Sequence, residues 1–290
     1  YGIFFSFLCV MFRAYYVGIT QTKILTINSV VMLLSNVVLN YCLIFGKGGF
    51  PVMGIAGAAI ASSVSEAVSL LFFIIYTGTT ADKRKYGFRR AFTFRPHLLK
   101  GMLSISGWTM VQSFISVSIW FIFFLAIEHL GERPLAVTNI VRNISALLIM
   151  VISAFATTAG ALISNQIGAG EQRYLFRTCG MTLNLTYAIL VPLLVILCLF
   201  PEPVLRVFTD NPSLIAASIN SVYVMSTSAL IMAPAFILFN AVSGTGNTKA
   251  GFIMEMISLT VYTAAVYYIV IRLKPDVALC WFSEHVYGIA

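Results

Sequence analysis

Four polar side chains with the chemistry of ion ligands lie inside apolar stretches of the sequence. Asn36 and Asn40 are four residues apart, and so are Ser62 and Glu66, which places each pair on one helix face about one turn apart. Amide and hydroxyl oxygens can ligate a cation, and a carboxylate inside a membrane span is costly enough to mark a functional candidate. The pattern predicts an ion-coupling site, although hydrogen bonds between packed helices explain the two asparagines equally well.

A polar and aromatic set follows in the apolar stretch 102–127. Trp108, Gln112, Ser116 and Trp120 recur there at roughly helical spacing. A flat aromatic surface with a few amides and hydroxyls suits bulky lipophilic cations. The set therefore predicts one wall of a substrate cavity, while a lipid-facing position near a membrane interface is the alternative for both tryptophans.

Three charged residues inside apolar stretches need partners. Arg142 is the one cation well inside a complete stretch, and a buried arginine requires an anion or a water-filled cavity. We expect Arg142 to face the substrate cavity, where it binds substrate or pairs with an acid such as Glu255. Glu255 itself lies near the predicted cytoplasmic end of its helix, where snorkelling towards water is the simpler explanation. Glu66 is open between an ion-coupling role and a solvated position that reaches water, Arg13 or Lys23.

Composition indicates which elements hold these side chains. Hydrophobic residues make up 59% of the 290 residues, charged residues make up only 10%, and the mean hydropathy is +0.93. In a soluble domain about a quarter of the residues are charged. Apolar stretches of roughly 20 residues recur along the chain without alternating polar positions, which predicts an all-α integral membrane protein and not a β-barrel. No constellation of nucleophile, base and orienting group appears, so we expect no enzyme.

The expected spans can be placed from the apolar stretches. Seven complete spans are predicted at 24–45, 54–77, 102–127, 135–165, 178–200, 214–240 and 250–271, with apolar stubs at 1–17 and 276–290. Pro192 and Pro234 interrupt two of these spans, and such prolines free carbonyl groups that neighbouring helices then satisfy. The five cysteines are scattered without CxxC spacing, which suggests neither a zinc site nor a disulfide framework. No metal site and no cofactor are expected.

Lysine and arginine are distributed unevenly over the predicted loops. They concentrate in 18–23, 78–101, 166–177 and 241–249, which the positive-inside rule places in the cytoplasm. The densest run, 83–100, is predicted to be a cytoplasmic linker attracted to lipid headgroups. Nucleic-acid binding is the alternative for this run, but no binding module accompanies it. Membrane lipid is therefore an expected partner, and nucleic acid is not.

An internal repeat indicates how the spans are grouped. An offset of 226 residues places GITQTK (18–23) on GTGNTK (244–249), and both copies lie in predicted cytoplasmic loops between corresponding spans. We therefore expect two homologous bundles: 1–82 ends the first, 83–100 links them, and 101–290 is the second. Because two such repeats do not fit into 290 residues, the parent sequence is expected to extend about 120–140 residues upstream.

Several motifs resemble the multidrug and toxic compound extrusion (MATE) transporters. NxxLNYxxIFG, GFP and GIAGAAIA (within 36–61) are similar to the fifth and sixth helices of that family. LISNQIGAGEQ (162–172), LRVFTDNPSLIAASINSVYV (205–224) and SGTGNTK (243–249) are similar to three of its later turns. The resemblance implies a twelve-helix antiporter of two pseudo-symmetric six-helix bundles. The first three helices and parts of the fourth and twelfth are missing here.

The resemblance also implies a function and residue roles. Positions matching Asn36, Asn40 and Ser62 help form the cation or proton site of the first bundle, together with an aspartate on a helix outside this chain. Sodium-linked relatives use acids on two helices that match 102–127 and 214–240, where this sequence has none, so sodium coordination of that kind is not expected. The expected function is a monomeric secondary antiporter of the bacterial inner membrane that exports small organic, drug-like cations in exchange for H⁺ or Na⁺. A lipid-linked oligosaccharide flippase and a membrane scaffold or channel are the alternatives.

Overall fold

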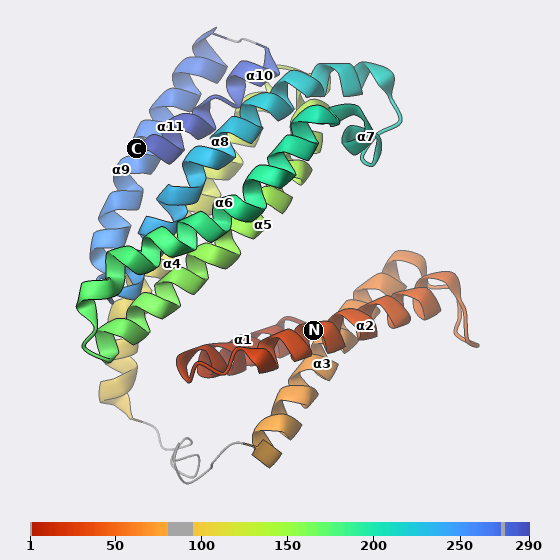
Figure 1. Cartoon of the computed structure of the whole chain (residues 1–290). Coiled ribbons are helices and arrows are strands. Elements are labelled where there is room, and N and C mark those ends of the chain that lie inside the picture. Colours follow the sequence, from red (N-terminus) through yellow and green to blue (C-terminus); the bar gives the residue numbers. More distant parts are fainter. Residues whose placement is uncertain (1, 81–94, 274–275) are drawn as a thin grey trace. The chain divides into compact units, whose positions relative to one another are not determined.

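The computed structural model of the chain describes residues 2–80, 95–273 and 276–290. All regular structure in these ranges is helical, and the chain divides into two units, Tyr1–Phe94 and Arg95–Ala290 (Figure 1). The predicted all-α class is confirmed. Residues 83–94 of the predicted linker lie outside the described residues.

The described residues contain seven helices that are long and apolar enough to cross a membrane, and they coincide with the seven predicted spans. The helices of unit 1 are α1 (Gly2–Gly18), α2 (Lys23–Phe45) and α3 (Gly54–Thr80). Unit 2 contains α4 (Pro96–Glu128), α5 (Glu132–Gly168), the 3₁₀ turn η2 (Gln172–Tyr174), α6 (Leu175–Leu199), α7 (Pro201–Arg206), α8 (Pro212–Gly244), α9 (Thr248–Val266), the π-helix η3 (Tyr267–Leu273), α10 (Val277–Cys280) and α11 (Ser283–Ile289).

Two boundaries differ from the prediction. α4 begins at Pro96, so it includes the last residues that the sequence assigned to the linker 83–100. Proline suits this position because the first turn of a helix leaves its amide hydrogens unbonded. The prediction missed this turn because its polar residues lower the local hydropathy. The predicted stub 276–290 is divided into α10 and α11, and the Asp276 carboxylate begins α10 by accepting from the Val277 amide at 2.8 Å.

α3 holds both of its neighbours in unit 1. Phe73 of α3 is fully buried and stacks on Tyr16 of α1, with ring centroids 5.8 Å apart. The Tyr16 hydroxyl also forms a buried hydrogen bond of 2.7 Å with the Thr77 hydroxyl, one turn further along α3. α2 approaches α3 at Gly57, where an added Cβ would lie 2.6 Å from the carbonyl oxygen of Leu43. Only glycine permits this close approach of the two backbones.

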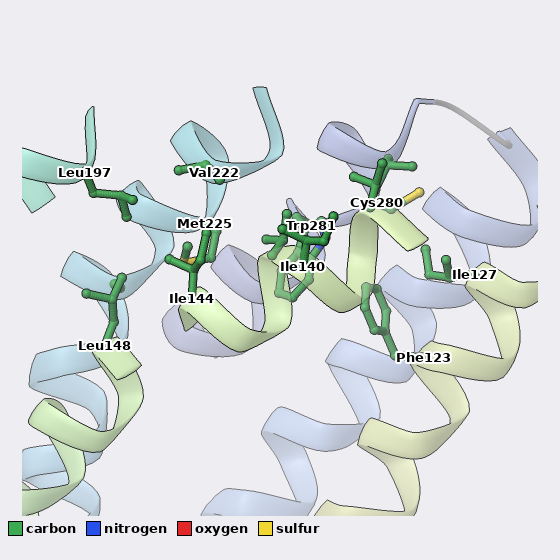
Figure 2. Close-up of a cluster of buried hydrophobic side chains, with 14 of the residues drawn as sticks. Phe123, Ile127, Ile140, Ile144, Leu148, Leu197, Val222, Met225, Cys280 and Trp281 are labelled. Atoms are coloured by element: carbon green, nitrogen blue, oxygen red, sulfur yellow. The ribbon is translucent and has the colours of Figure 1, made fainter. Parts of the chain in front are cut away.

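α8 forms the centre of unit 2, where it packs against α5, α6 and α11. Figure 2 shows the buried apolar core that these helices share with α4 and the end of the chain: Phe123, Ile127, Ile140, Ile144, Leu148, Leu197, Val222, Met225, Cys280 and Trp281. α5 and α8 come closest at Gly160 and Gly244. A Cβ added to Gly160 would lie 2.8 Å from the Asn240 carbonyl oxygen, and one added to Gly244 would touch the Gly160 carbonyl oxygen. Small residues thus let two long helices cross with their backbones in contact.

A side chain of α6 bonds the carbonyl group that the proline inside α8 leaves free. Pro234 cannot donate a hydrogen bond to the carbonyl group of Leu230, four residues before it. The hydroxyl of Tyr187 donates to this carbonyl oxygen at 2.8 Å. A neighbouring helix therefore satisfies the group that the proline frees, as we expected from the sequence.

The internal repeat is visible in the backbone conformation. Thr20 joins α1 to α2 with a φ of 61°, and Gly246 joins α8 to α9 with a φ of 84°. The offset of 226 residues relates these two positions. Both helix pairs are thus connected through one left-handed residue at the same place, which supports a parallel repeat.

Candidate functional site

Asn36 and Asn40 lie together on α2, as their spacing predicts. The Asn40 amide nitrogen donates to the Asn36 amide oxygen at 2.8 Å, and both side chains are half-buried. The amide oxygen of Asn40 is buried and accepts no hydrogen bond within the described residues. Ser62 of α3 is exposed and Glu66 is half-buried, and the described part of the chain shows no hydrogen bond from either to the asparagines. The structure therefore brings together two of the four predicted ion-coupling residues.

The predicted cationic partners of Glu66 do not bind it. Among the described residues, Glu66 forms no ion pair with Arg13 or Lys23. The guanidinium group of Arg13 lies 4.0 Å from the sulfur of Met32 instead. The Glu66 side chain is therefore solvated through its partial exposure.

Unit 1 holds a further buried amide that sequence reasoning missed. Asn28 of α2 is fully buried, and its amide nitrogen donates to the Ser69 hydroxyl of α3 at 2.8 Å. The amide oxygen of Asn28 is also buried without a hydrogen-bond partner in the described residues. Asn28 lies near the start of the predicted span 24–45. A polar residue at a span end needs no partner within the membrane, so no sequence pattern singled it out.

Unit 2 contains a hydrogen-bonded group that we call the Glu–Tyr cluster: Ser116, Glu255, Tyr262, Glu284 and Tyr287. Glu255 of α9 accepts from Ser116 of α4 and from Tyr287 of α11, both at 2.8 Å. Glu284 of α11 accepts from Tyr262 of α9 at 2.9 Å. The two tyrosine rings meet edge to face, with centroids 5.5 Å apart. Each of the two helices thus supplies a carboxylate to the other and a tyrosine that binds the other's carboxylate.

Two cavities adjoin the Glu–Tyr cluster, one at each carboxylate. The first has a volume of about 570 Å³ and is lined by α8, α9 and α11, including Glu255, Tyr287, Asn240 and Ser258. The second has a volume of about 500 Å³ and is lined by Glu284 with residues of α4 and α5. Glu284 is almost fully buried, at 7% exposure. Each carboxylate therefore borders one of the two cavities.

Arg142 lines the second cavity, where it contacts an aromatic ring. Its guanidinium carbon lies 5.2 Å from the centre of the Phe124 ring, which is the geometry of a cation–π contact. Trp120 and Glu284 line the same cavity as Arg142. Arg142 thus lines a cavity, and among the described residues it forms no ion pair with Glu255.

The remaining predicted cavity residues follow one face of α4. Gln112 is buried, at 8% exposure. Ser116 lies one turn after Gln112 on α4 and donates a hydrogen bond to Glu255. Trp108 packs against Phe252 of α9 with ring centroids 5.1 Å apart. The five predicted substrate residues thus do not line one common cavity. Trp120 and Arg142 share one, while Ser116 reaches the carboxylate that lines the other.

Sequence reasoning missed the contribution of the last two helices. Glu284 stands in the stub 276–290, which we expected to be simply apolar, and Tyr262 and Tyr287 gave no signal of their own. The rule that marks an intramembrane carboxylate as functional would have found Glu284. The tyrosines become recognisable only from the packing of α9 against α11.

Long apolar helices in two units, with buried amides in one and carboxylates beside cavities in the other, are those of a multi-span membrane protein. The chain belongs to the MatE family, whose sequence profile matches residues 109–269. This is a family of transporters and not of enzymes. The family predicted from the sequence motifs is therefore confirmed.

Curated relatives have similar sequences over most of this chain. A Thermotoga maritima protein described as probable multidrug resistance protein NorM is 27% identical over 248 residues, which cover 82% of this chain and 51% of that protein. The uncharacterized transporter YisQ of Bacillus subtilis is 25% identical over 266 residues, which cover 88% and 56%. The chain thus spans about half the length of the curated relatives it matches.

Solved structures share the fold. A crystal structure of MATE in complex with MaL6 superposes with a TM-score of 0.83 at 19% identity, over 99% of this chain and 65% of that one. An outward-facing conformation of a multidrug resistance MATE family transporter has a TM-score of 0.81 at 17% identity, over 93% and 60%. These similarities establish that the helical arrangement is that of MATE transporters.

Proposed function

We propose that the whole protein is a monomeric secondary antiporter of the bacterial inner membrane. It exports small organic, drug-like cations in exchange for H⁺ or Na⁺. The relatives described as multidrug resistance proteins support drug export. The observation that carries the proposal is the carboxylate of Glu255, which lines a largely apolar cavity of about 570 Å³ within unit 2.

The first cavity suits a lipophilic cation in size and in chemistry. Its volume of about 570 Å³ falls within the range of about 300–1,000 Å³ that drug-sized ligands occupy. Phe236 and Phe239 of α8 and Ile257 of α9 contribute to its walls. A carboxylate without a basic partner attracts the charge of the ligand, and aromatic faces add cation–π attraction. Neutral molecules of the same size gain only the apolar part of this binding.

α4 extends the proposed substrate contacts from the first cavity to the second. Ser116 binds Glu255 at the first cavity, and Trp120 lines the second one turn further on. Gln112 and Trp108 stand one and two turns earlier on the same helix. With Arg142 on α5, these residues are the proposed substrate contacts. The guanidinium group of Arg142 suits an acceptor oxygen of the substrate and not its positive charge.

Ion coupling in unit 1 is proposed for Asn36, Asn40, Ser62 and Glu66. The free amide oxygen of Asn40 is an acceptor that a cation or a protonated acid can occupy. An ion that binds more tightly in one of the outward-open and inward-open states shifts the balance between them by that difference in affinity. Exchange of the ion for a substrate then drives alternating access.

Inverted membrane vesicles that contain the full transporter test this function. Ethidium serves as the probe, and its fluorescence reports uptake after a pH or Na⁺ gradient is imposed. We expect accumulation that depends on one of the gradients, and slower accumulation in Asn36→Ala and Asn40→Ala. Asn139→Ala is the matched control, because the Asn139 amide of α5 donates to the Leu135 carbonyl of its own helix, at 3.1 Å, and to no other group in the described part of the chain.

Two results would contradict the proposal at different levels. Ethidium accumulation by the unmodified protein that depends on neither the pH gradient nor the Na⁺ gradient would refute antiport. Unchanged coupling in the Asn36 and Asn40 variants, with normal amounts of protein in the membrane, would refute the site in unit 1.

A further inference from the structure

Two opposite charges line the second cavity without pairing. Arg142 of α5 and Glu284 of α11 both contribute to its walls, and neither forms an ion pair within the described residues. We propose that this cavity binds a zwitterionic phospholipid, whose phosphate group contacts Arg142 and whose ammonium group contacts Glu284. This goes beyond the proposed function, and lipid binding can be measured without transport.

Two donors in the cavity walls have no acceptor in the protein. The guanidinium group of Arg142 lies against the Phe124 ring, and it donates no hydrogen bond to any residue that the structure describes. Trp281 lines the same cavity, and its buried indole N–H also lacks a hydrogen-bond partner among those residues. Both groups can donate to the oxygens of a phosphate. The anionic part of the ligand is therefore expected beside them.

The carboxylate of Glu284 supplies the opposite charge. Its Oε1 accepts from the Tyr262 hydroxyl at 2.9 Å, and this is its one hydrogen bond within the described helices. Because Glu284 is almost fully buried, a negative charge there without a cationic partner is costly. An ammonium group on the ligand supplies that partner, and the aromatic rings of Trp120 and Trp281 in the same walls also favour a cation. A zwitterion thus satisfies both charges and adds no net charge to the cavity.

The second cavity lies at the depth of lipid headgroups. α5 has 37 residues and is about 55 Å long, so about 12 Å at each end extends beyond a hydrocarbon core of about 30 Å. Arg142 stands about 15 Å from the start of α5 at Glu132. Trp120 stands about 12 Å from the end of α4 at Glu128, which a short turn joins to the start of α5. Both side chains are therefore near the boundary between headgroups and hydrocarbon, where tryptophan is enriched.

The walls of the second cavity change from polar to apolar with depth in the membrane. The residues that α5 contributes are first polar, at Arg142, Asn143 and Ser145. One to two turns deeper they are apolar, at Ile149 and Met150, and Met150 is 71% exposed. A phospholipid has the same order, with its headgroup at the surface of the bilayer and its acyl chains below. This order favours a lipid over a water-soluble zwitterion, which has no acyl chain for the apolar part.

A bound lipid shares residues with the proposed substrate contacts. Trp120 and Arg142 belong to both sets, so lipid and substrate exclude each other at the second cavity. Ser116 and Glu255, at the first cavity, remain available to substrate. Release of the lipid is then a step of substrate binding at the second cavity only.

Native mass spectrometry of the full transporter tests the proposal. Equal amounts of dioleoyl phosphatidylethanolamine and dioleoyl phosphatidylglycerol are added to the protein in detergent, and the intensities of the two lipid adducts are compared. The two lipids have the same acyl chains and both have a phosphate, but only phosphatidylethanolamine has an ammonium group. We expect phosphatidylethanolamine to be the first lipid bound about ten times as often, which is the ratio for one charge-assisted contact.

Variants of the two charges should change lipid binding in different ways. Glu284→Gln, which can still accept from Tyr262, should lower the ratio of the two lipids to about one, because the ammonium group loses its partner. Arg142→Met should weaken the binding of both lipids about tenfold, because both lose a partner of the phosphate. Glu128→Gln of α4 and Arg206→Met of α7 are matched controls at exposed positions and should change neither quantity. Circular dichroism shows whether each variant retains its helices.

Three results would overturn the proposal. Equal lipid ratios in the unmodified protein and in Glu284→Gln would overturn the ammonium contact. Equal lipid affinities in Arg142→Met and Arg206→Met would overturn the phosphate contact. Displacement of the lipid by an equal concentration of water-soluble glycerophosphoethanolamine would show that the headgroup alone is sufficient and would overturn the assignment to a lipid.

The outcomes also distinguish this proposal from the proposed function. Lipid selectivity in a protein whose ethidium transport depends on neither gradient would uphold the lipid site and refute antiport. Gradient-dependent ethidium transport by a protein that binds the two lipids equally would uphold antiport and refute the lipid site.

Discussion

The hydrogen bond from Tyr187 to the Leu230 carbonyl, the group that Pro234 cannot bond, permits a double-mutant test of how α8 is stabilised. Tyr187→Phe removes only the hydroxyl that donates to the Leu230 carbonyl oxygen at 2.8 Å. Because residue 234 is proline, no amide hydrogen stands four residues ahead to replace that donor. The variant therefore leaves a carbonyl group without a partner inside an apolar bundle.

The expected cost follows from this geometry. A buried acceptor left unsatisfied costs about 1–3 kcal/mol, while hydrogen bonds between membrane helices average about 0.6 kcal/mol because an alternative partner is usually found. Here the proline removes that alternative, so we expect Tyr187→Phe to lower the free energy of unfolding by about 1–2 kcal/mol. In a Pro234→Ala background the new amide can bond the Leu230 carbonyl, and the same change should cost less than about 0.5 kcal/mol.

Reversible unfolding in mixed detergent micelles measures all four proteins of this cycle. Tyr223→Phe is the control, because the Tyr223 hydroxyl is exposed and lies 3.5 Å from the Cys198 carbonyl oxygen, and it should change stability little. Equal costs of Tyr187→Phe in the two backgrounds would refute the reasoning. The contribution of the hydroxyl would then not depend on the carbonyl group that the proline leaves free.

Three further variants test contacts elsewhere in the chain, each by the same unfolding measurement. Gly160→Ala should destabilise unit 2 by about 1–3 kcal/mol, because its Cβ would lie 2.8 Å from a backbone oxygen. Gly180→Ala, which has open space around it, should be neutral or stabilising. Equal effects of the two variants would contradict the backbone contact. Thr20→Gly should stabilise unit 1 by about 0.5–1 kcal/mol, since a β-branched residue at a φ of 61° is strained, and a loss of stability would contradict this. Tyr16→Phe should cost about 1 kcal/mol through its 2.7 Å bond to Thr77, and Thr77→Val in the same background should add little; additive costs would argue against that bond.

The spans were predictable because each is apolar around its whole circumference over the thickness of a bilayer. The ends were less so, because helices continue beyond the hydrocarbon layer with polar residues, as α4 does from Pro96. The division of 276–290 was not predictable from hydropathy either. It depends on Asp276, whose carboxylate begins α10 locally.

In the candidate site, the relation between residues on one helix was predictable from the sequence, and the contacts between helices were not. Asn36 and Asn40 are one turn apart on one helix, so their shared face followed from spacing alone, although the hydrogen bond between them was not predicted. Ser116 and Glu255 are 139 residues apart, and their contact depends on which faces α4 and α9 turn to each other. No periodicity in a single sequence reports that choice. For this reason the sequence left two alternatives open for Arg142, substrate binding or pairing with an acid such as Glu255, and the second is absent among the described residues.

The π-helix η3, which follows α9 over Tyr267–Leu273, has a consequence for how the two halves of the repeat can be aligned. A π turn bonds each residue to the fifth one along and so accommodates one residue more than an α turn, which is what a single-residue insertion produces in a helix. Its counterpart α2 is α-helical throughout Lys23–Phe45. The constant offset of 226 is therefore expected to hold as far as Tyr41 and Tyr267 and to require a one-residue gap beyond them. A duplicated ancestor of the two halves would have lacked that residue, and side chains such as Arg272 would face a different direction without it.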